Sequence, residues 1–407
     1  ADYVRQKRDE ACLLARRLTD AAGTQTGSPV FDAYCRQSLL DNVLRGGWPL
    51  ILGSEAQPHV YHVYSRKHGA LERDYNDFTV AAEMYSQGHG SYRDVNQNRR
   101  CDVLLVPRVG DYNVLAFLGL IQADGYNPLV VHGSRFTVSA PNRAPILALV
   151  DRPDELEPAL ARPFTPGQLL KTIADRQIGL TVAPRDFIAT ALTQAEAHFE
   201  ASFGEGYWVD HWTYNLDLID TYLAVYPDRK DELLFGPSTV PYFDSPVVVQ
   251  PRDRKHVLVD GEVRQYGAVL EDEEKAALIA SRTETPSLMR TGGGHGEVVR
   301  TTVFAKLVFL AAIKFATLDP LGMGIEMEAG RPGWYDALNG LPALLGSSLA
   351  EPYELERLLT FLLEAMAEKG DGAVDLPVEQ VALLRLLAQA VDEWQDAVDL
   401  DRDYRYW

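Results

Sequence analysis

The stretch from Val298 to Leu318, VVRTTVFAKLVFLAAIKFATL, is the feature that most constrains the fold of this 407-residue chain. As a helix it is apolar on nearly every face, and only Arg300, Lys306 and Lys314 interrupt it. A helix without a polar face is covered by other elements on all sides, so it belongs inside a large helical array. The hydrophobic content of 46% is ample for such a core.

Amphipathic patterns elsewhere predict further helices. One begins at Ser28-Pro29, an N-cap followed by a first-turn proline, and ends at Gly46-Gly47. Others are expected at about residues 95–106, 112–123, 166–174, 184–203, 212–225, 351–368 and 377–398. These helices, with little strand, favour a helical toroid or bundle in which loops at one end build a pocket.

Two segments break the helical pattern. Residues 53–90 mix charge, aromatic side chains and glycine with poor periodicity, which indicates a long ordered loop that carries function. Asp260-Gly261 lies between two apolar runs and is typical of a two-residue β-hairpin turn. We therefore expect an all-α fold with a small β-hairpin excursion.

Composition excludes some classes of protein. The chain carries 39 Lys and Arg against 58 Asp and Glu, a net charge of −19, which argues against nucleic acid as a partner. No apolar run approaches the roughly 18–20 residues that span a bilayer, and the start has no signal-peptide pattern, so we expect a cytoplasmic protein without membrane contact. Cys12, Cys35 and Cys101 are expected to be buried thiols in a reducing compartment.

The stretch GRPGWYDALNGLP surrounds one carboxylate with aromatic and polar side chains. It contains Arg331, Trp334, Tyr335 and Asp336. An aromatic ring can pack on the apolar face of a sugar, and a carboxylic acid can protonate a glycosidic oxygen as its bond breaks. The structural alternative makes Asp336 a helix N-cap and Trp334 a loop anchor.

Two further clusters have the side chains of a sugar site. In GSYRDVNQNRR, the side chains of Arg93, Asp94 and Gln97 match the alternating donors and acceptors of a polyol; the alternative is a capped helix with a solvated first turn. The segment from Phe203 to Asp220 supplies candidate acids and an aromatic ring at Glu205, Trp208 and Asp210, whereas Trp212, Leu216 and Ile219 fit core positions at helical spacing. His211 has no metal-ligand companion at a recognised spacing, so no metal site is expected.

The fourth cluster, MRTGGGHGEVVR, could bind an anion. Successive glycines let the backbone approach an anion, and Arg290, Thr291, Gly292 and His295 supply donors. The pattern matches neither the P-loop nor the dinucleotide fingerprint, so a flexible loop is the alternative.

Taken together, YRDVNQN early in the chain and GWYDALNG after the buried helix resemble the catalytic barrel of glycoside phosphorylases related to cellobiose phosphorylase. That family carries Tyr/Phe-Arg-Asp-Ser/Thr-x-Gln-Asp and Gly-Asp-Trp-Asn-Asp-Gly-Met-Asn elements on an (α/α)6 toroid. The match covers these short motifs and the helical layout. Ala337, Leu338 and Val95 depart from the family pattern, and the chain shows no clear counterpart of its Thr-Gly phosphate ligands.

The resemblance implies a single (α/α)6-type toroid over residues 1–407, the barrel portion of a longer multidomain enzyme. Asp336 would be the general acid, Trp334 would pack beside the reacting sugar, and Arg93 and Asp94 would hold the glycone with Gln97 nearby. The family reaction is inverting phosphorolysis of a β-glucosidic bond in a disaccharide or oligosaccharide. Inorganic phosphate is then the co-substrate, no further cofactor is implied, and a homodimer is compatible with this interpretation.

Two other hypotheses stay open. An inverting hydrolase would use a second carboxylate, Glu205 or Asp210, at roughly 6.5–9.5 Å from Asp336 with a water between them. A noncatalytic carbohydrate-binding module would use the aromatic side chains for binding alone, and its Asp336 would have no role in turnover. Arg290, Thr291, Gly292 and His295 are the phosphate ligands that we expect from their chemistry alone.

Overall fold

The structure is a computed structural model that describes residues 1–63, 83–204, 210–251, 254, 256–265, 269–319, 324–326, 347–370, 372–399 and 401–406. The chain forms two compact units, each built from two separate segments. The first comprises Ala1–Gly110 and Val131–Glu200, and the second comprises Asp111–Val130 and Ala201–Trp407. The single toroid expected over residues 1–407 stays a prediction.

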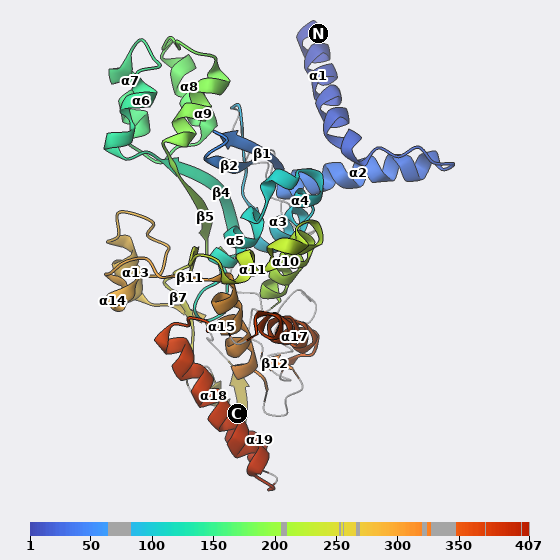
Figure 1. The fold of residues 1–407 in the computed structure, drawn as a ribbon, viewed down its shortest axis with the longest axis vertical. Coiled ribbons are helices and arrows are strands. Elements are labelled where there is room, and N and C mark those ends of the chain that lie inside the picture. Colours follow the sequence, from blue (N-terminus) through green and yellow to red (C-terminus); the bar gives the residue numbers. More distant parts are fainter. Residues whose placement is uncertain are drawn as a thin grey trace. The chain divides into compact units, whose positions relative to one another are not determined.

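The first unit combines helices with small sheets (Figure 1). Its β1 and β2 form an antiparallel pair that runs from Trp48 opposite Val63 to Gly53 opposite Pro58, and β3, β4 and β5 form a three-stranded sheet in that order. Figure 1 shows α6 to α9 grouped at one end of the long strands β4 and β5. The helices and strands are α1 (Asp2–Thr19), α2 (Pro29–Gly46), β1 (Trp48–Gly53), β2 (Pro58–Val63), β3 (Gly90–Ser91), α3 (Tyr92–Arg99), α4 (Asp102–Leu105), β4 (Val130–Thr137), α6 (Ala144–Leu147), α7 (Pro153–Leu160), α8 (Pro166–Asp175), α9 (Pro184–Thr193) and β5 (Glu196–Ser202), with short 3-10 turns at Asp20–Ala22, Pro107–Val109 and Ala140–Asn142.

Local sequence signals explain where these helices begin. The Ser28 side chain accepts a hydrogen bond from the backbone N–H of Phe31, and Pro29 occupies the first turn of α2. Thr165 and Gln168 form a reciprocal capping box at the start of α8. The core of this unit is apolar and aromatic, with Phe136 and Phe187 completely buried within it.

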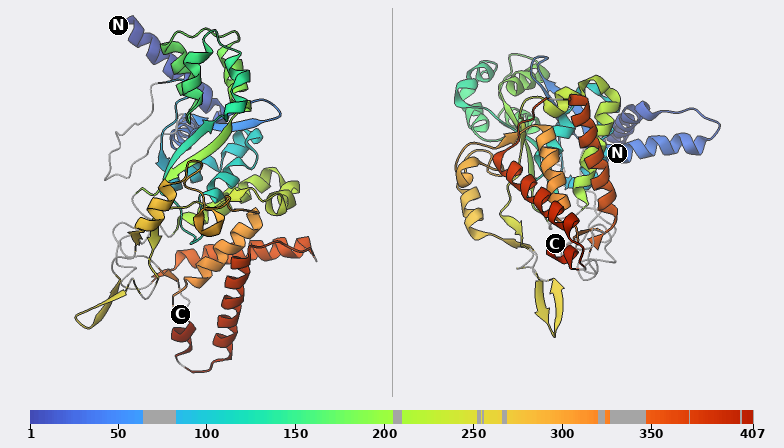
Figure 2. Two further views of the ribbon diagram at one scale, coloured as in Figure 1. Left: turned by 90° about the vertical axis from the view of Figure 1, so that its left-hand side faces the viewer. Right: turned by 60° about the horizontal axis from the view of Figure 1, so that its bottom comes forward.

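The second unit is mainly helical with short two-stranded pairs. In Figure 2 the hairpin β8–β9 extends as a two-stranded ribbon, drawn in yellow. The helices and strands are α5 (Tyr112–Gly119), α10 (Tyr214–Val225), α11 (Lys230–Phe235), β6 (Val240–Pro241), β7 (Val247–Val249), β8 (His256–Val259), β9 (Glu262–Gln265), β10 (Val269–Glu271), α13 (Glu273–Ala280), α14 (Thr291–Gly294), β11 (Arg300–Thr301), α15 (Val303–Ala316), β12 (Ile325–Glu326), β13 (Ser347–Ser348), α17 (Ala350–Lys369), α18 (Val378–Asp396) and α19 (Arg402–Tyr406), with 3-10 turns at His211–Thr213 and Pro227–Arg229.

The helix α15 lies at the centre of this unit, as its apolar sequence predicts. It packs against α5, α11, α17 and α18. The side chain of Lys306 is buried in this packing, and its Nζ donates to the carbonyl oxygens of Ile121 at 2.6 Å and Pro241 at 2.8 Å. The Nζ also lies 3.4 Å from the centroid of the Tyr242 ring. These contacts satisfy the hydrogen-bonding capacity of the buried amino group, which an apolar helix would otherwise exclude.

The helical class is confirmed, but the described residues contain more strand than the sequence patterns indicate, and they form no closed barrel. The helix expected over residues 184–203 ends at Thr193, because Glu196–Ser202 alternates with period two and pairs as β5 in a sheet. Residues 64–82 of the loop expected over residues 53–90 lie outside the described residues, and Pro58–Val63 within it forms β2.

Other expectations have mixed outcomes. The hairpin turn is confirmed, since Asp260 and Gly261 have φ angles of 52° and 82° between β8 and β9. The burial expected for the cysteines is wrong, because Cys12 is exposed and Cys35 and Cys101 are partly exposed. No helix in the described part of the chain is both long and apolar enough to cross a membrane.

Candidate functional site

Several predicted site residues lie outside the described residues, so the structure gives no position for them. They are Glu205, Trp208, Arg331, Trp334, Tyr335 and Asp336. The predicted residues that the structure does describe lie in three places: on α3 in the first unit, at the start of α10 in the second unit, and around α14 in the second unit.

The start of α3 fixes the predicted sugar ligands Arg93 and Asp94. Ser91 caps the helix by accepting from the backbone N–H of Asp94 at 3.3 Å, and its hydroxyl donates to Asp94 Oδ2 at 3.0 Å. Arg93 Nη2 donates to Asp94 Oδ1 at 3.3 Å, and Arg45 Nη1 lies 3.9 Å from the same oxygen. Both side chains are largely buried, with 18% of Arg93 and 13% of Asp94 exposed. The carboxylate is thus held in one orientation and remains partly accessible, as a hydroxyl acceptor requires.

The opposite face of α3 is buried and carries an amide without a partner. Tyr92, Val95, Asn96 and Arg99 lie on this face at helical spacing. Asn96 is completely buried, and within the described part of the chain neither its Oδ1 nor its Nδ2 has a hydrogen-bond partner. Gln97, one position further, is only half-buried. Burying an amide without hydrogen bonds lowers the stability of the protein, so packing alone does not explain Asn96 in the YRDVNQN helix.

A buried histidine and aspartate lie in the same unit as α3. His62 Nε2 on β2 is 2.7 Å from Asp102 Oδ2 on α4. The pKa of His62 is lowered to about 4, mainly by burial and also by the charge of Arg99, while the hydrogen bond to Asp102 opposes both. The imidazole is therefore neutral at pH 7, and its Nε2–H donates to the carboxylate, which can only accept.

Arg99 is part of the same buried cluster. Its Nε donates to the carbonyl oxygen of Gly46 at 2.6 Å, and its guanidinium lies 5.6 Å from the centroid of the Phe199 ring. No local sequence pattern points to His62 and Asp102, because they are 40 positions apart in the chain. A fold-level contact of this kind leaves no local spacing signal.

The predicted carboxylate Asp210 lies just before α10, and one of its two oxygens accepts a hydrogen bond from the protein. Asp210 Oδ2 accepts from the Tyr214 hydroxyl at 2.8 Å. The other oxygen, Oδ1, is buried and has no hydrogen-bond partner among the residues that the structure describes. His211 Nδ1 lies 3.4 Å from the side-chain nitrogen of Asn127. The unused oxygen of Asp210 is the acceptor that a water molecule or a hydroxyl group would need.

A lysine lies beside the aromatic rings of Trp212 and Tyr126. Trp212 is buried, and Lys314 Nζ lies 5.9 Å from its ring centroid and 4.7 Å from that of Tyr126. Burial raises the pKa of the Asp124 carboxyl, and a backbone hydrogen bond to Tyr126 and the charge of Lys314 oppose that rise. Such a carboxyl keeps its proton to higher pH than an exposed one, which suits a proton donor. Trp212 is thus a core residue, as its spacing indicated, within a polar surrounding.

The guanidinium of Arg290 binds its own loop. Arg290 Nη2 donates to the carbonyl oxygen of Glu284 at 2.7 Å, and Nη1 donates to that of Gly296 at 3.2 Å. Thr291, Gly292 and His295 are exposed, and Gly292 adopts a left-handed conformation with φ of 59°. These contacts favour a structural role for Arg290, and phosphate binding by this cluster stays a prediction.

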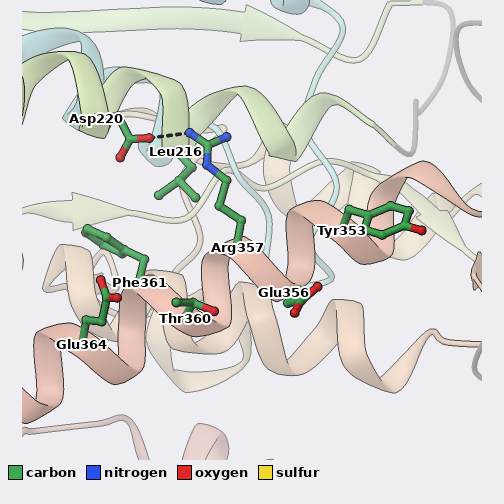
Figure 3. A pocket seen from close by; sticks show the side chains of 8 residues that line it. All are labelled: Leu216, Asp220, Tyr353, Glu356, Arg357, Thr360, Phe361 and Glu364. Carbon is green, nitrogen blue, oxygen red and sulfur yellow. Dashed lines mark hydrogen bonds and ion pairs between the residues drawn. The ribbon is translucent and has the colours of Figure 1, made fainter.

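A cavity of about 400 Å³ lies between α10 and α17 (Figure 3). Among the residues that line it, the sequence patterns point only to Leu216, as a core position. Arg357 on α17 joins the helices: Nη1 and Nη2 each donate to Asp217 Oδ1 at 3.0 Å, Nη1 donates to Glu354 at 3.0 Å, and Nη2 also donates to Asp220. The lining residues are Leu216, Asp220, Tyr353, Glu356, Arg357, Thr360, Phe361 and Glu364.

The described residues offer no metal centre, since no three His, Cys, Asp or Glu side chains among them lie close enough to hold an ion. No protein-family model matches the chain, and a comparison with curated proteins gives no significant match.

Proposed function

We propose that this chain is the helical catalytic part of a carbohydrate-active enzyme that cleaves a β-glucosidic bond by inverting phosphorolysis, on an (α/α)6-type toroid. The observation that carries the proposal is the Arg93–Asp94 pair on α3. It lies in the YRDVNQN motif, it is largely buried, and the hydroxyl of Ser91 orients its carboxylate. A fixed carboxylate beside a guanidinium is well suited to accept from and donate to neighbouring sugar hydroxyls.

In this proposal Asp336 is the only protein proton donor that the reaction needs. Phosphate attacks the anomeric carbon from one face, the bond to the leaving oxygen breaks, and the acid transfers its proton to that oxygen from the other face. Phosphate replaces the base-activated water of an inverting hydrolase. Trp334 and Tyr335, in the same motif, would bind the sugar by stacking.

The test is release of sugar 1-phosphate and of free reducing sugar from β-glucan oligosaccharides, with and without inorganic phosphate. Phosphate-dependent sugar 1-phosphate is the expected product. Asp336→Asn should lower turnover at least on the order of 10²-fold while the fold is retained. A smaller loss in a folded variant would mean that Asp336 has no role in the mechanism. If the parent binds saccharide without turnover, and Asp336→Asn binds it equally well, the chain is a noncatalytic carbohydrate-binding module.

Inverting hydrolysis is the second candidate, and Asp210 is the observation that favours it. One carboxylate oxygen of Asp210 is held by Tyr214, whereas the other has no hydrogen-bond partner among the described residues. A base that activates water has one oxygen held in place and the other without a partner in the protein. Reducing sugar released without phosphate, and lost in Asp210→Asn, would establish hydrolysis.

A further inference from the structure

The cavity between α10 and α17 has a rigid polar wall. Arg357 is anchored by Asp217 and Asp220 from α10 and by Glu354 from its own helix. Three carboxylates therefore surround its charge, and the side chain is held in place. This network fixes one wall of a cavity whose volume, about 400 Å³, is in the range of small-molecule sites.

Aromatic rings lie at both ends of the cavity. In Figure 3, Tyr353 lies at one end of the row of α17 side chains, and Phe361 lies with Glu364 at the other end. Tyr353 and Phe361 are eight positions apart, which corresponds to about 12 Å along a helix axis. Tyr353 is 67% exposed, whereas the Phe361 ring already carries Lys230 Nζ at 5.5 Å from its centroid. The ring of Tyr353 thus offers the open apolar surface.

The polar groups that line the cavity select the ligand. Glu356, Thr360 and Glu364 line the cavity, and no ion pair involving Glu356 or Glu364 occurs among the described residues. Because the nearby arginine is already neutralised, these carboxylates repel phosphate and other anions. They accept hydrogen bonds, and a neutral pyranose supplies hydroxyl donors together with an apolar face for the tyrosine ring.

We propose that the cavity between α10 and α17 is a saccharide-binding site that holds at least two linked neutral pyranose units. One unit stacks on Tyr353, and hydroxyl groups donate to Glu356 and Glu364. Glu356 and Glu364 are eight positions apart, which corresponds to about 12 Å along the helix axis, so a ligand that reaches both carboxylates is extended rather than a monosaccharide. The choice of a saccharide rests on the proposed function, whereas the chemistry of the cavity alone requires a ligand that combines hydrogen-bond donors with an apolar face.

The experiment measures hydrogen–deuterium exchange of the α17 backbone in the full chain, with cellobiose, cellotetraose or glucose added. Asp336→Asn serves as the parent so that the ligand is not consumed. Protection of residues 353–364 by cellotetraose and cellobiose, and weaker protection by glucose, is expected. Tyr353→Ala should weaken this binding about tenfold. Tyr34→Ala is the matched control, because Tyr34 lies on α2 and is also 67% exposed.

Two outcomes would overturn the inference. One is equal protection of α17 in the parent and in Tyr353→Ala. The other is protection by the cation spermidine but by none of the sugars, which would make the cavity a site for organic cations. If saccharide protection depends on Tyr353 but the unsubstituted chain shows no turnover, this site is supported and the proposed enzymatic function is contradicted. If the unsubstituted chain shows turnover but α17 is not protected, the enzymatic function is supported and this site is contradicted.

Discussion

His62 Nε2 lies 2.7 Å from Asp102 Oδ2, and both side chains are almost completely buried in the first unit. Burial keeps the imidazole neutral, with its pKa lowered to about 4. An unfolded chain would protonate the same ring near its usual pKa of about 6.5. The pair therefore links the stability of this unit to pH.

The free energy of unfolding should fall as the pH is lowered from about 6.5 to about 4. In this window the unfolded state binds more protons at His62 than the folded state, so protonation favours unfolding, by about 3 kcal/mol in total. Urea titrations at several pH values measure the loss. His62→Gln should flatten the profile in this window, and equal profiles for the parent and His62→Gln would contradict the assignment.

Arg93→Gln is expected to lower turnover about tenfold or more with little change in stability. The guanidinium lies beside the Asp94 carboxylate at the proposed sugar site, and glutamine supplies fewer donors and no charge. Turnover of β-glucan oligosaccharides and the thermal midpoint should be measured on the same preparations. Arg108→Gln is the control, since Arg108 is exposed on the 3-10 turn Pro107–Val109; an equal loss in both variants would remove Arg93 from the site.

Asn96→Leu should stabilise the protein by about 1–2 kcal/mol, because it replaces a buried amide that has no hydrogen-bond partner among the described residues with an apolar group of similar size. Asn215→Leu should have the opposite sign. Asn215 is equally buried, and its Nδ2 donates to the Trp212 carbonyl at 3.0 Å. Chemical unfolding of both variants decides the matter, and destabilisation by Asn96→Leu would mean that the amide is satisfied in solution.

Lys306→Met should destabilise the second unit by about 2–4 kcal/mol. The substitution keeps the apolar stem, but it leaves the carbonyl oxygens of Ile121 and Pro241 without their donor inside the protein. Thermal and urea unfolding measure the effect. Lys7→Met on the exposed helix α1 should leave the unfolding midpoint unchanged, so a similar small effect for both lysines would refute the role assigned to Lys306.

Arg357→Gln should cost about 1 kcal/mol or less, although Arg357 contacts three carboxylates. The network is more than one-third exposed at the arginine, so water screens it, and added salt should shrink the difference from the parent. Unfolding in low and high salt tests this. A large loss that does not depend on salt would show that Arg357 acts through packing.

Sequence patterns predicted the parts of this fold that local chemistry decides. The apolar run that became α15 needs cover on all sides whatever surrounds it, and Asp260-Gly261 supplies the left-handed turn of β8–β9 by itself. The strand at residues 196–202 was wrongly predicted as helix. Pairing with β4, which is distant in the chain, decides its conformation, and a local pattern does not show that pairing.

The same division applies to the candidate sites. Arg93 and Asp94 were found in the sequence because one helix start brings them together. The contact of His62 with Asp102 and the contact of Arg357 with Asp217 join residues 40 and 140 positions apart. Such contacts exist only in the folded chain, so no local sequence motif predicts them.

The second unit takes Asp111–Val130 from before the long stretch Val131–Glu200, which belongs to the first unit. Lys306 binds the carbonyl oxygen of Ile121 across this interruption. During synthesis, α5 and Ile121 therefore leave the ribosome before α15, and their contacts with it form only later. Contacts between such distant segments form slowly. Neither unit can be expressed as one uninterrupted fragment, and a cut after residue 200 would leave α5 without the helix that covers it.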